Sequence, residues 1–158
     1  MIRVLVTEDS DTARALLTAI LAEDCTIQIV GEARNGAEAI TMARELKPDL
    51  ITMDLSMPVV DGFTATEQIM TATPVPIVVV SAFSNLTEAK AAARALSSGA
   101  LTVLQKPPGV SAPGYAESAR NLIATVKAMA DSRWFIELPV LAARSLRRPP
   151  LTGIRGRV

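Results

Sequence analysis

The apolar positions of the chain fall into short continuous runs that alternate with longer segments of helical spacing. Residues 50–53 and 77–80 are almost wholly apolar, a pattern typical of strands that are buried on both faces of a parallel sheet. The pattern predicts five strands, over residues 2–6, 27–33, 49–53, 76–80 and 100–105.

Each predicted strand is followed by a segment whose apolar residues recur every three or four positions, as on one face of an amphipathic helix. Ser10, Asn35 and Ser84 are suited to cap the amino ends of the first, second and fourth of these helices. Gly99 stands where the fourth helix should end, and the fifth helix is predicted over Tyr115–Ala130.

This alternation of strands and helices indicates the fold class. Strands joined by right-handed helical crossovers lie parallel in one sheet, and the helices cover both of its faces. The sequence therefore predicts a doubly wound α/β fold, with a five-stranded parallel sheet flanked by five helices.

The distribution of charge predicts a boundary near residue 131. Residues 1–131 hold 10 Lys+Arg against 15 Asp+Glu, a net charge of −5, whereas residues 132–158 hold six arginines and one glutamate, a net charge of +5. We expect one domain over 1–131 and a basic tail or linker over 132–158. The tail is too short for a helix-turn-helix domain, so we do not expect nucleic acid as a partner.

Composition excludes several classes of protein. The 158-residue chain has no histidine, so it cannot form a Ser-His-Asp triad or most zinc sites. Its one cysteine, Cys25, cannot form an internal disulfide. No apolar run approaches the roughly 18 residues of a membrane span, and no signal-peptide pattern opens the chain. We therefore expect a cytoplasmic protein with no membrane partner.

Polar residues follow the ends of four predicted strands. Glu8 and Asp9 follow the first strand, Asp54 the third, Ser81 the fourth and Lys106 the fifth. In such sheets, binding sites form outside the carboxyl ends of the strands. We expect these side chains to meet in one cleft.

Three carboxylates beside one lysine leave an excess of negative charge. Such crowding raises carboxylate pKa values unless a cation intervenes, and oxygen ligands at a hydrated site favour Mg²⁺. A carboxylate at the edge of the metal site is suited to attack a phosphoryl group, whose oxygens the metal and the lysine would neutralise. The cluster therefore predicts phosphoryl chemistry at Asp54.

At these residues the chain resembles the receiver domains of response regulators, the phosphoacceptor proteins of two-component signalling. The resemblance covers about residues 1–131 and implies the flavodoxin-like strand order 2-1-3-4-5. It rests on four motifs: Glu8-Asp9-Ser10, Asp54-Leu55-Ser56-Met57-Pro58 with Asp61-Gly62, Ser81-Ala82, and Lys106-Pro107.

The resemblance implies that a sensor histidine kinase or a phosphotransfer protein phosphorylates Asp54. It also implies that Asp9, Asp54 and the backbone carbonyl of Ser56 bind Mg²⁺, with Glu8 supporting them nearby. These roles are expectations that come from the resemblance.

The same resemblance assigns roles to the other strand ends. Lys106 would pair with the phosphoryl group and Ser81 would donate a hydrogen bond to it, while Lys106-Pro107 would be a cis peptide. The output partner or effector domain would bind the face formed by the fourth helix, the fifth strand and the fifth helix.

Among receivers, the chain looks most similar to the amino-terminal domain of chemotaxis protein-glutamate methylesterases, which implies a role in chemotaxis signalling. The sequence has no Gly-x-Ser-x-Gly nucleophile turn and no histidine to serve it, so we expect no methylesterase domain and a signalling domain rather than an enzyme. The similarity rests on Val79-Val80-Ser81-Ala82, Ser98-Gly99-Ala100 and Lys106-Pro107-Pro108-Gly109.

One position departs from the family pattern. Receivers usually carry a phenylalanine or tyrosine three residues before the lysine, and this ring changes rotamer on activation; here the residue is Val103. Valine is stiff at χ1 and too small for such a swing. We therefore expect switching to involve the loop 81–86, with Phe83 either as its mobile apolar group or simply packed against the loop.

Two enzyme classes remain as alternatives. A covalent-aspartate phosphatase or phosphotransferase would use Asp54 in the same way, but dehalogenase-type phosphatases need a second acid where this chain has Ser56. A dinucleotide-binding enzyme needs a Gly-x-Gly-x-x-Gly turn after its first strand. Gly31 and Gly36 are too far apart, and they lie in and just after the second strand rather than after the first.

Overall fold

A computed structural model describes residues 1–82 and 88–131 of the chain. In it the strands form a single parallel sheet in the order β2-β1-β3-β4-β5, which confirms the predicted fold class and strand order. The strands are β1 (Ile2–Thr7), β2 (Ile27–Ala33), β3 (Leu50–Met53), β4 (Ile77–Ser81) and β5 (Thr102–Gln105).

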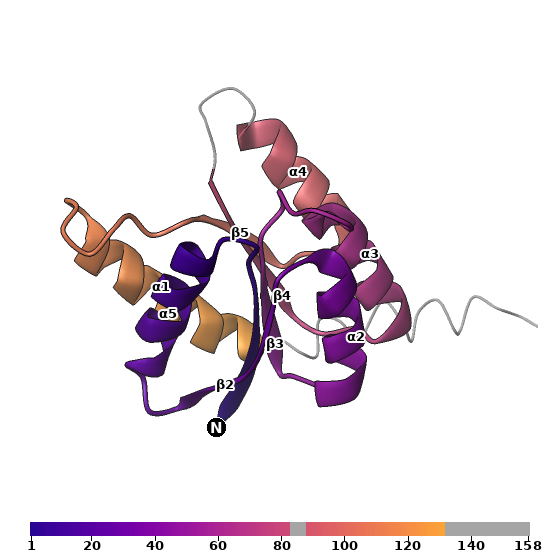
Figure 1. Cartoon of the computed structure of the whole chain (residues 1–158), viewed down its shortest axis with the longest axis horizontal. Helices are drawn as coiled ribbons and strands as arrows, with labels where there is room; N and C mark the ends of the chain where they lie inside the picture. Colours follow the sequence, from indigo (N-terminus) through magenta and orange to yellow (C-terminus); the bar gives the residue numbers. More distant parts are fainter. Residues whose placement is uncertain (83–87, 132–158) are drawn as a thin grey trace, which may run out of the picture.

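Helices cover both faces of the sheet, so the domain has three layers. Helices α1 and α5 lie on one face, and α2, α3 and α4 lie on the other (Figure 1). The helices are α1 (Asp11–Ala22), α2 (Gly36–Leu46), α3 (Gly62–Ala72), α4 (Glu88–Ser98) and α5 (Tyr115–Ala130). None of the helices in the described segments is long and apolar enough to cross a membrane.

The core has two halves because alternate strand residues face opposite sides of the sheet. In β1, Leu5 packs with α2, α3 and α4, whereas Val4 and Val6 pack with α1 and α5. Strand β3 is buried at all four positions. Each buried aliphatic side chain contributes about 1.5–3 kcal/mol, so the packing fixes β3 and the residue that follows it.

Polar side chains cap the helices at the carboxyl edge of the sheet. The Ser10 hydroxyl accepts from the Ala13 N–H at 3.3 Å, as predicted for α1. The Asn35 side chain accepts from the Glu38 N–H at 2.9 Å, as predicted for α2.

Gly99 ends α4 with a φ of +115°, a conformation that favours glycine. The predicted cap of α4, Ser84, lies outside the described residues.

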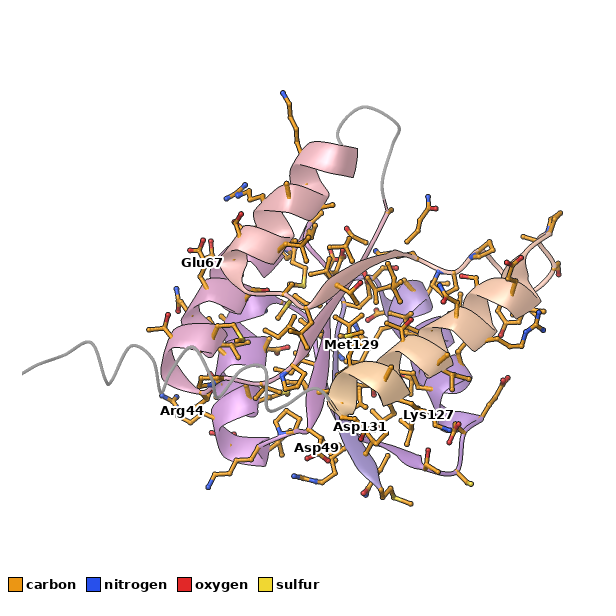
Figure 2. All side chains as sticks on the ribbon, turned by 180° about the vertical axis from the view of Figure 1, so that it is seen from behind. Arg44, Asp49, Glu67, Lys127, Met129 and Asp131 are labelled. Carbon is orange, nitrogen blue, oxygen red and sulfur yellow. The ribbon has the colours of Figure 1, made fainter. Side chains whose placement is uncertain are left out.

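At the opposite edge of the sheet, an ion pair joins α5 to the turn between α1 and β2. Lys127, labelled on α5 in Figure 2, lies with its Nζ 3.1 Å from Asp24 Oδ2. Hydrogen bonds from the Thr26 side chain and backbone, with that from Lys127, lower the pKa of Asp24 to about 2. This contact ties the last helix to the turn before β2, far from the carboxyl ends of the strands.

Candidate phosphoacceptor site

Asp54 directly follows β3 at the carboxyl edge of the sheet. Its N–H donates to the Thr7 carbonyl at 3.0 Å, and the residue is only 2% exposed. Gly62 at the start of α3 packs on its backbone, because a Cβ at Gly62 would lie 2.0 Å from the Asp54 carbonyl oxygen. The position of Asp54 therefore depends on β3 and on a glycine that lets α3 approach.

Two side chains bind the carboxylate of Asp54, one on each oxygen. The Ser81 hydroxyl at the end of β4 donates to Oδ1 at 3.1 Å. The Lys106 ammonium, just after β5, lies 3.2 Å from Oδ2. The predicted meeting of the third, fourth and fifth strand ends is therefore observed, and it fixes both carboxylate oxygens.

Lys106 also reaches the first strand end. Its Nζ lies 2.9 Å from Glu8 Oε2, and the Glu8 side chain is fully buried whereas that of Lys106 is 23% exposed. The Lys106 backbone N–H donates to the Ser81 carbonyl at 3.1 Å. One lysine thus pairs with two buried carboxylates that come from different strands.

Burial and pairing shift the proton affinities of this pair. Burial raises the pKa of Glu8 from its ordinary 4.5 to about 7, although the hydrogen bond from Lys106 opposes that shift. For Lys106, burial alone would lower the pKa, but the hydrogen bond to Glu8 and the charge of Asp54 outweigh it and raise the pKa. Lys106 therefore stays charged at neutral pH. Glu8, with a pKa of about 7, changes its protonation in that pH range.

Carboxylate oxygens of Glu8, Asp9 and Asp54 all lie within 4.8 Å of one another. Glu8 and Asp54 are buried, whereas Asp9 is exposed. With Lys106 as the neighbouring cation, the cluster keeps excess negative charge when its carboxylates are ionised. This donor set is compatible with a hard divalent cation such as Mg²⁺. Ser56 lies in the exposed loop after Asp54, and its role as a carbonyl ligand stays a prediction.

The sequence analysis missed Arg14, a buried arginine that binds the backbone of the loop carrying Glu8 and Asp9. Arg14 on α1 is 8% exposed, and its NH1 donates to the Glu8 carbonyl oxygen at 2.9 Å. Its guanidinium also pairs with Asp11 and lies 3.6 Å from Glu32 Oε1. The signal was available, because Arg14 stands three residues before Leu17 on the face that α1 buries.

The predicted cis peptide at Lys106-Pro107 is wrong, since every peptide bond in the described residues is trans. The trans form of a bond before proline is favoured by about 0.5–1 kcal/mol, so a cis bond needs a local reason. In this structure Lys106 reaches both Glu8 and Asp54 from the trans conformation.

Val103, in the position that is usually aromatic, lies in β5 and packs against the half-core beneath α2, α3 and α4. It is partly buried, as an aliphatic residue of an edge strand should be. The proposed mobile residue Phe83 lies outside the described residues, and so does the basic tail 132–158. The expectations about both stay predictions.

Comparisons with known proteins agree with this geometry. The family model of the response regulator receiver domain matches residues 4–112. The chain is 51% identical over 129 residues to protein-glutamate methylesterase/protein-glutamine glutaminase 3 of Anaeromyxobacter dehalogenans, covering 82% of this chain and 37% of that protein. It is 43% identical over 145 residues to protein-glutamate methylesterase/protein-glutamine glutaminase 2 of Methanospirillum hungatei, covering 92% of this chain and 40% of that protein.

A solved structure gives the same result. The response regulator domain of Thermotoga maritima CheB is 34% identical, with a TM-score of 0.74, and the match covers 83% of this chain and 97% of that domain. The chain spans well under half the length of the two curated methylesterases. Sequence, fold and site agree: the chain belongs to the response regulator receiver domain family and is similar to the receivers of chemotaxis methylesterases.

Proposed function

We propose that Asp54 accepts a phosphoryl group, in a Mg²⁺-dependent reaction, from a sensor histidine kinase or a phosphotransfer protein. The observation that carries this proposal is the buried Asp54 carboxylate, with one oxygen on Ser81 and the other on Lys106. A carboxylate that only capped a helix or closed a turn would not need a lysine and a hydroxyl from two further strands.

The chemistry is a group transfer to a carboxylate oxygen. An Asp54 oxygen forms a bond to phosphorus as the P–N bond of a phosphohistidine donor breaks, and the departing imidazole nitrogen keeps the electron pair of that bond and takes up a proton. Lys106 and Ser81 already donate hydrogen bonds to the Asp54 oxygens, so they are placed to bind phosphoryl oxygens after transfer. No histidine or other base from this chain is needed.

Glu8 and Asp9 are proposed to have different roles, one beside the lysine and one at the metal. Asp9 is exposed and Glu8 is fully buried against Lys106, so Asp9 is the better candidate for a direct metal ligand and Glu8 for the support of the lysine. Asp9, Asp54 and the Ser56 carbonyl would hold Mg²⁺, which when bound neutralises phosphoryl oxygens.

Phosphorylation is proposed to change binding at the face formed by α4, β5 and α5. Ser81 ends β4 and Lys106 follows β5, so groups that contact the phosphoryl oxygens are joined directly to the strands beneath that face. The similarity to methylesterases supports an effector in chemotaxis signalling. A donor kinase that uses ATP also requires a cytoplasmic receiver, and this location is part of the proposal.

The test is labelling with a small phosphodonor such as acetyl phosphate. With Mg²⁺ the chain should gain one hydroxylamine-sensitive phosphoryl group, which Asp54→Asn abolishes and the exposed control Asp131→Asn leaves unchanged. Undiminished labelling of Asp54→Asn would contradict the proposal. Release of many phosphates per chain would instead support the covalent-aspartate phosphatase.

A further inference from the structure

The loop between β1 and α1 carries the two neighbouring acidic residues, Glu8 and Asp9, and an arginine holds its backbone. Arg14 NH1 donates to the Glu8 carbonyl oxygen at 2.9 Å, in a buried contact. The Glu8 carbonyl belongs to the same planar peptide unit as the Asp9 N–H. This planar unit ends at the Asp9 Cα, which carries the Asp9 side chain. A bond that fixes the Glu8 carbonyl therefore fixes the peptide plane next to that side chain.

The N–H groups of Glu8 and Ser10, on either side of this peptide plane, have partners of their own. The Glu8 N–H donates to the Ala33 carbonyl of β2 at 3.0 Å, which continues the sheet. The Ser10 N–H donates to Glu8 Oε1 at 3.1 Å. Among the described residues, the hydrogen bond from Arg14 is the contact that holds the Glu8–Asp9 peptide between these two anchors.

The arginine itself is held in place by acidic partners on both sides. Its guanidinium pairs with Asp11 in the first turn of α1 and lies 3.6 Å from Glu32 of β2. A planar guanidinium with several donors keeps a fixed orientation when two or more of them are bound. Arg14 is thus a rigid support between the helix, the second strand and the loop.

We propose that Arg14 is a positioning residue for Asp9, which it holds in the orientation that binds the divalent cation. This inference rests on the proposed Mg²⁺-dependent function. It makes a prediction opposite to that of simple electrostatics. A cation near an acidic metal site opposes metal binding through its charge, so removing Arg14 should tighten binding if charge were its only effect.

The test measures Mg²⁺ affinity by amide-shift titration in Arg14→Met and Arg14→Lys. Loss of a group that orients a metal ligand typically weakens affinity by 10- to 100-fold, so we expect Arg14→Met to weaken Mg²⁺ binding by about tenfold. Arg14→Lys keeps the positive charge and one donor nitrogen, and it should lose less. Arg120→Met, which removes an exposed arginine of α5, should leave the affinity unchanged.

A second variant separates the carbonyl bond from the surrounding charges. Glu32→Gln removes the acidic partner on β2 and leaves the bond from Arg14 to Glu8 in place. Its Mg²⁺ affinity should stay within about twofold of the wild type, because Asp11 still pairs with the Arg14 guanidinium. A loss as large as that of Arg14→Met would overturn the inference, and so would unchanged or tighter binding by Arg14→Met.

A readout without metal keeps this inference separate from the proposed function. Amide exchange at Glu8 and Ser10, measured in EDTA, should be faster in Arg14→Met than in the wild type or Arg120→Met. If wild-type protein fails to bind Mg²⁺, the proposed function fails, and unchanged exchange at these two amides overturns the positioning role. If Arg14→Met does not fold, the same criteria apply to Arg14→Lys.

Discussion

Replacing Glu8 by glutamine removes the buried carboxyl that pairs with Lys106 and keeps the shape of the side chain. The pKa of Glu8 is about 7 in the folded chain, against an ordinary value of 4.5. One pKa unit corresponds to about 1.4 kcal/mol, so ionised Glu8 costs the folded chain about 3 kcal/mol relative to the unfolded chain. The side chain has no solvent exposure that would screen this cost.

The direction of the pH dependence follows from the sign of the shift. Because the folded pKa is raised, the folded chain holds this proton when the unfolded chain has lost it. The contribution of protonated Glu8 to stability is complete below pH 4.5 and is lost as the pH rises through about 7. Glu8→Gln should not show this loss, since its side chain does not titrate.

The assay is urea unfolding in EDTA between about pH 4.5 and pH 8, for wild type, Glu8→Gln and the exposed control Glu45→Gln. The free energy of unfolding of the wild type, minus that of Glu8→Gln, should fall by about 3 kcal/mol across this range. The difference between wild type and Glu45→Gln should stay flat. A constant difference for Glu8→Gln would refute the raised pKa and the burial on which it depends.

Two further predictions concern packing and the distant ion pair. Gly62→Ala should destabilise the fold by about 2–3 kcal/mol or more and reduce labelling of Asp54, because its Cβ would lie 2.0 Å from the Asp54 carbonyl. Gly109→Ala, whose Cβ would meet nothing within 4 Å, should behave as wild type in urea unfolding and labelling. Asp24→Asn should lower stability at neutral pH, since the hydrogen bonds from Thr26 hold the Asp24 pKa near 2; stability measured towards pH 2 should converge with that of wild type.

The sequence predicted the site because parallel strands bring their carboxyl ends to one edge of a sheet. Asp54, Ser81 and Lys106 needed only this rule and the apolar runs that precede them. The ends of the elements were predicted less accurately. The fifth strand begins at Thr102 and not at residue 100, because the Ala100 N–H still donates to the Ala95 carbonyl at the end of α4.

The features that the sequence analysis missed depend on contacts between elements. The polar partners of Arg14 include the Glu8 carbonyl and Glu32, and no local pattern shows that a strand will present them. The requirement for glycine at position 62 likewise arises from the approach of α3 to the Asp54 backbone. The cis peptide was expected from resemblance alone, and the trans bond shows that Lys106 reaches its partners without it.

The most direct test of the central claim is to locate the phosphoryl group on the chain. After incubation with acetyl phosphate and Mg²⁺, reduction with borohydride converts an aspartyl phosphate to homoserine, which peptide mass spectrometry assigns to one residue. We predict homoserine at position 54, and its absence when Mg²⁺ is omitted. Conversion at Asp9, Asp61 or another carboxylate, with Asp54 intact, would contradict the claim that Asp54 is the phosphoacceptor.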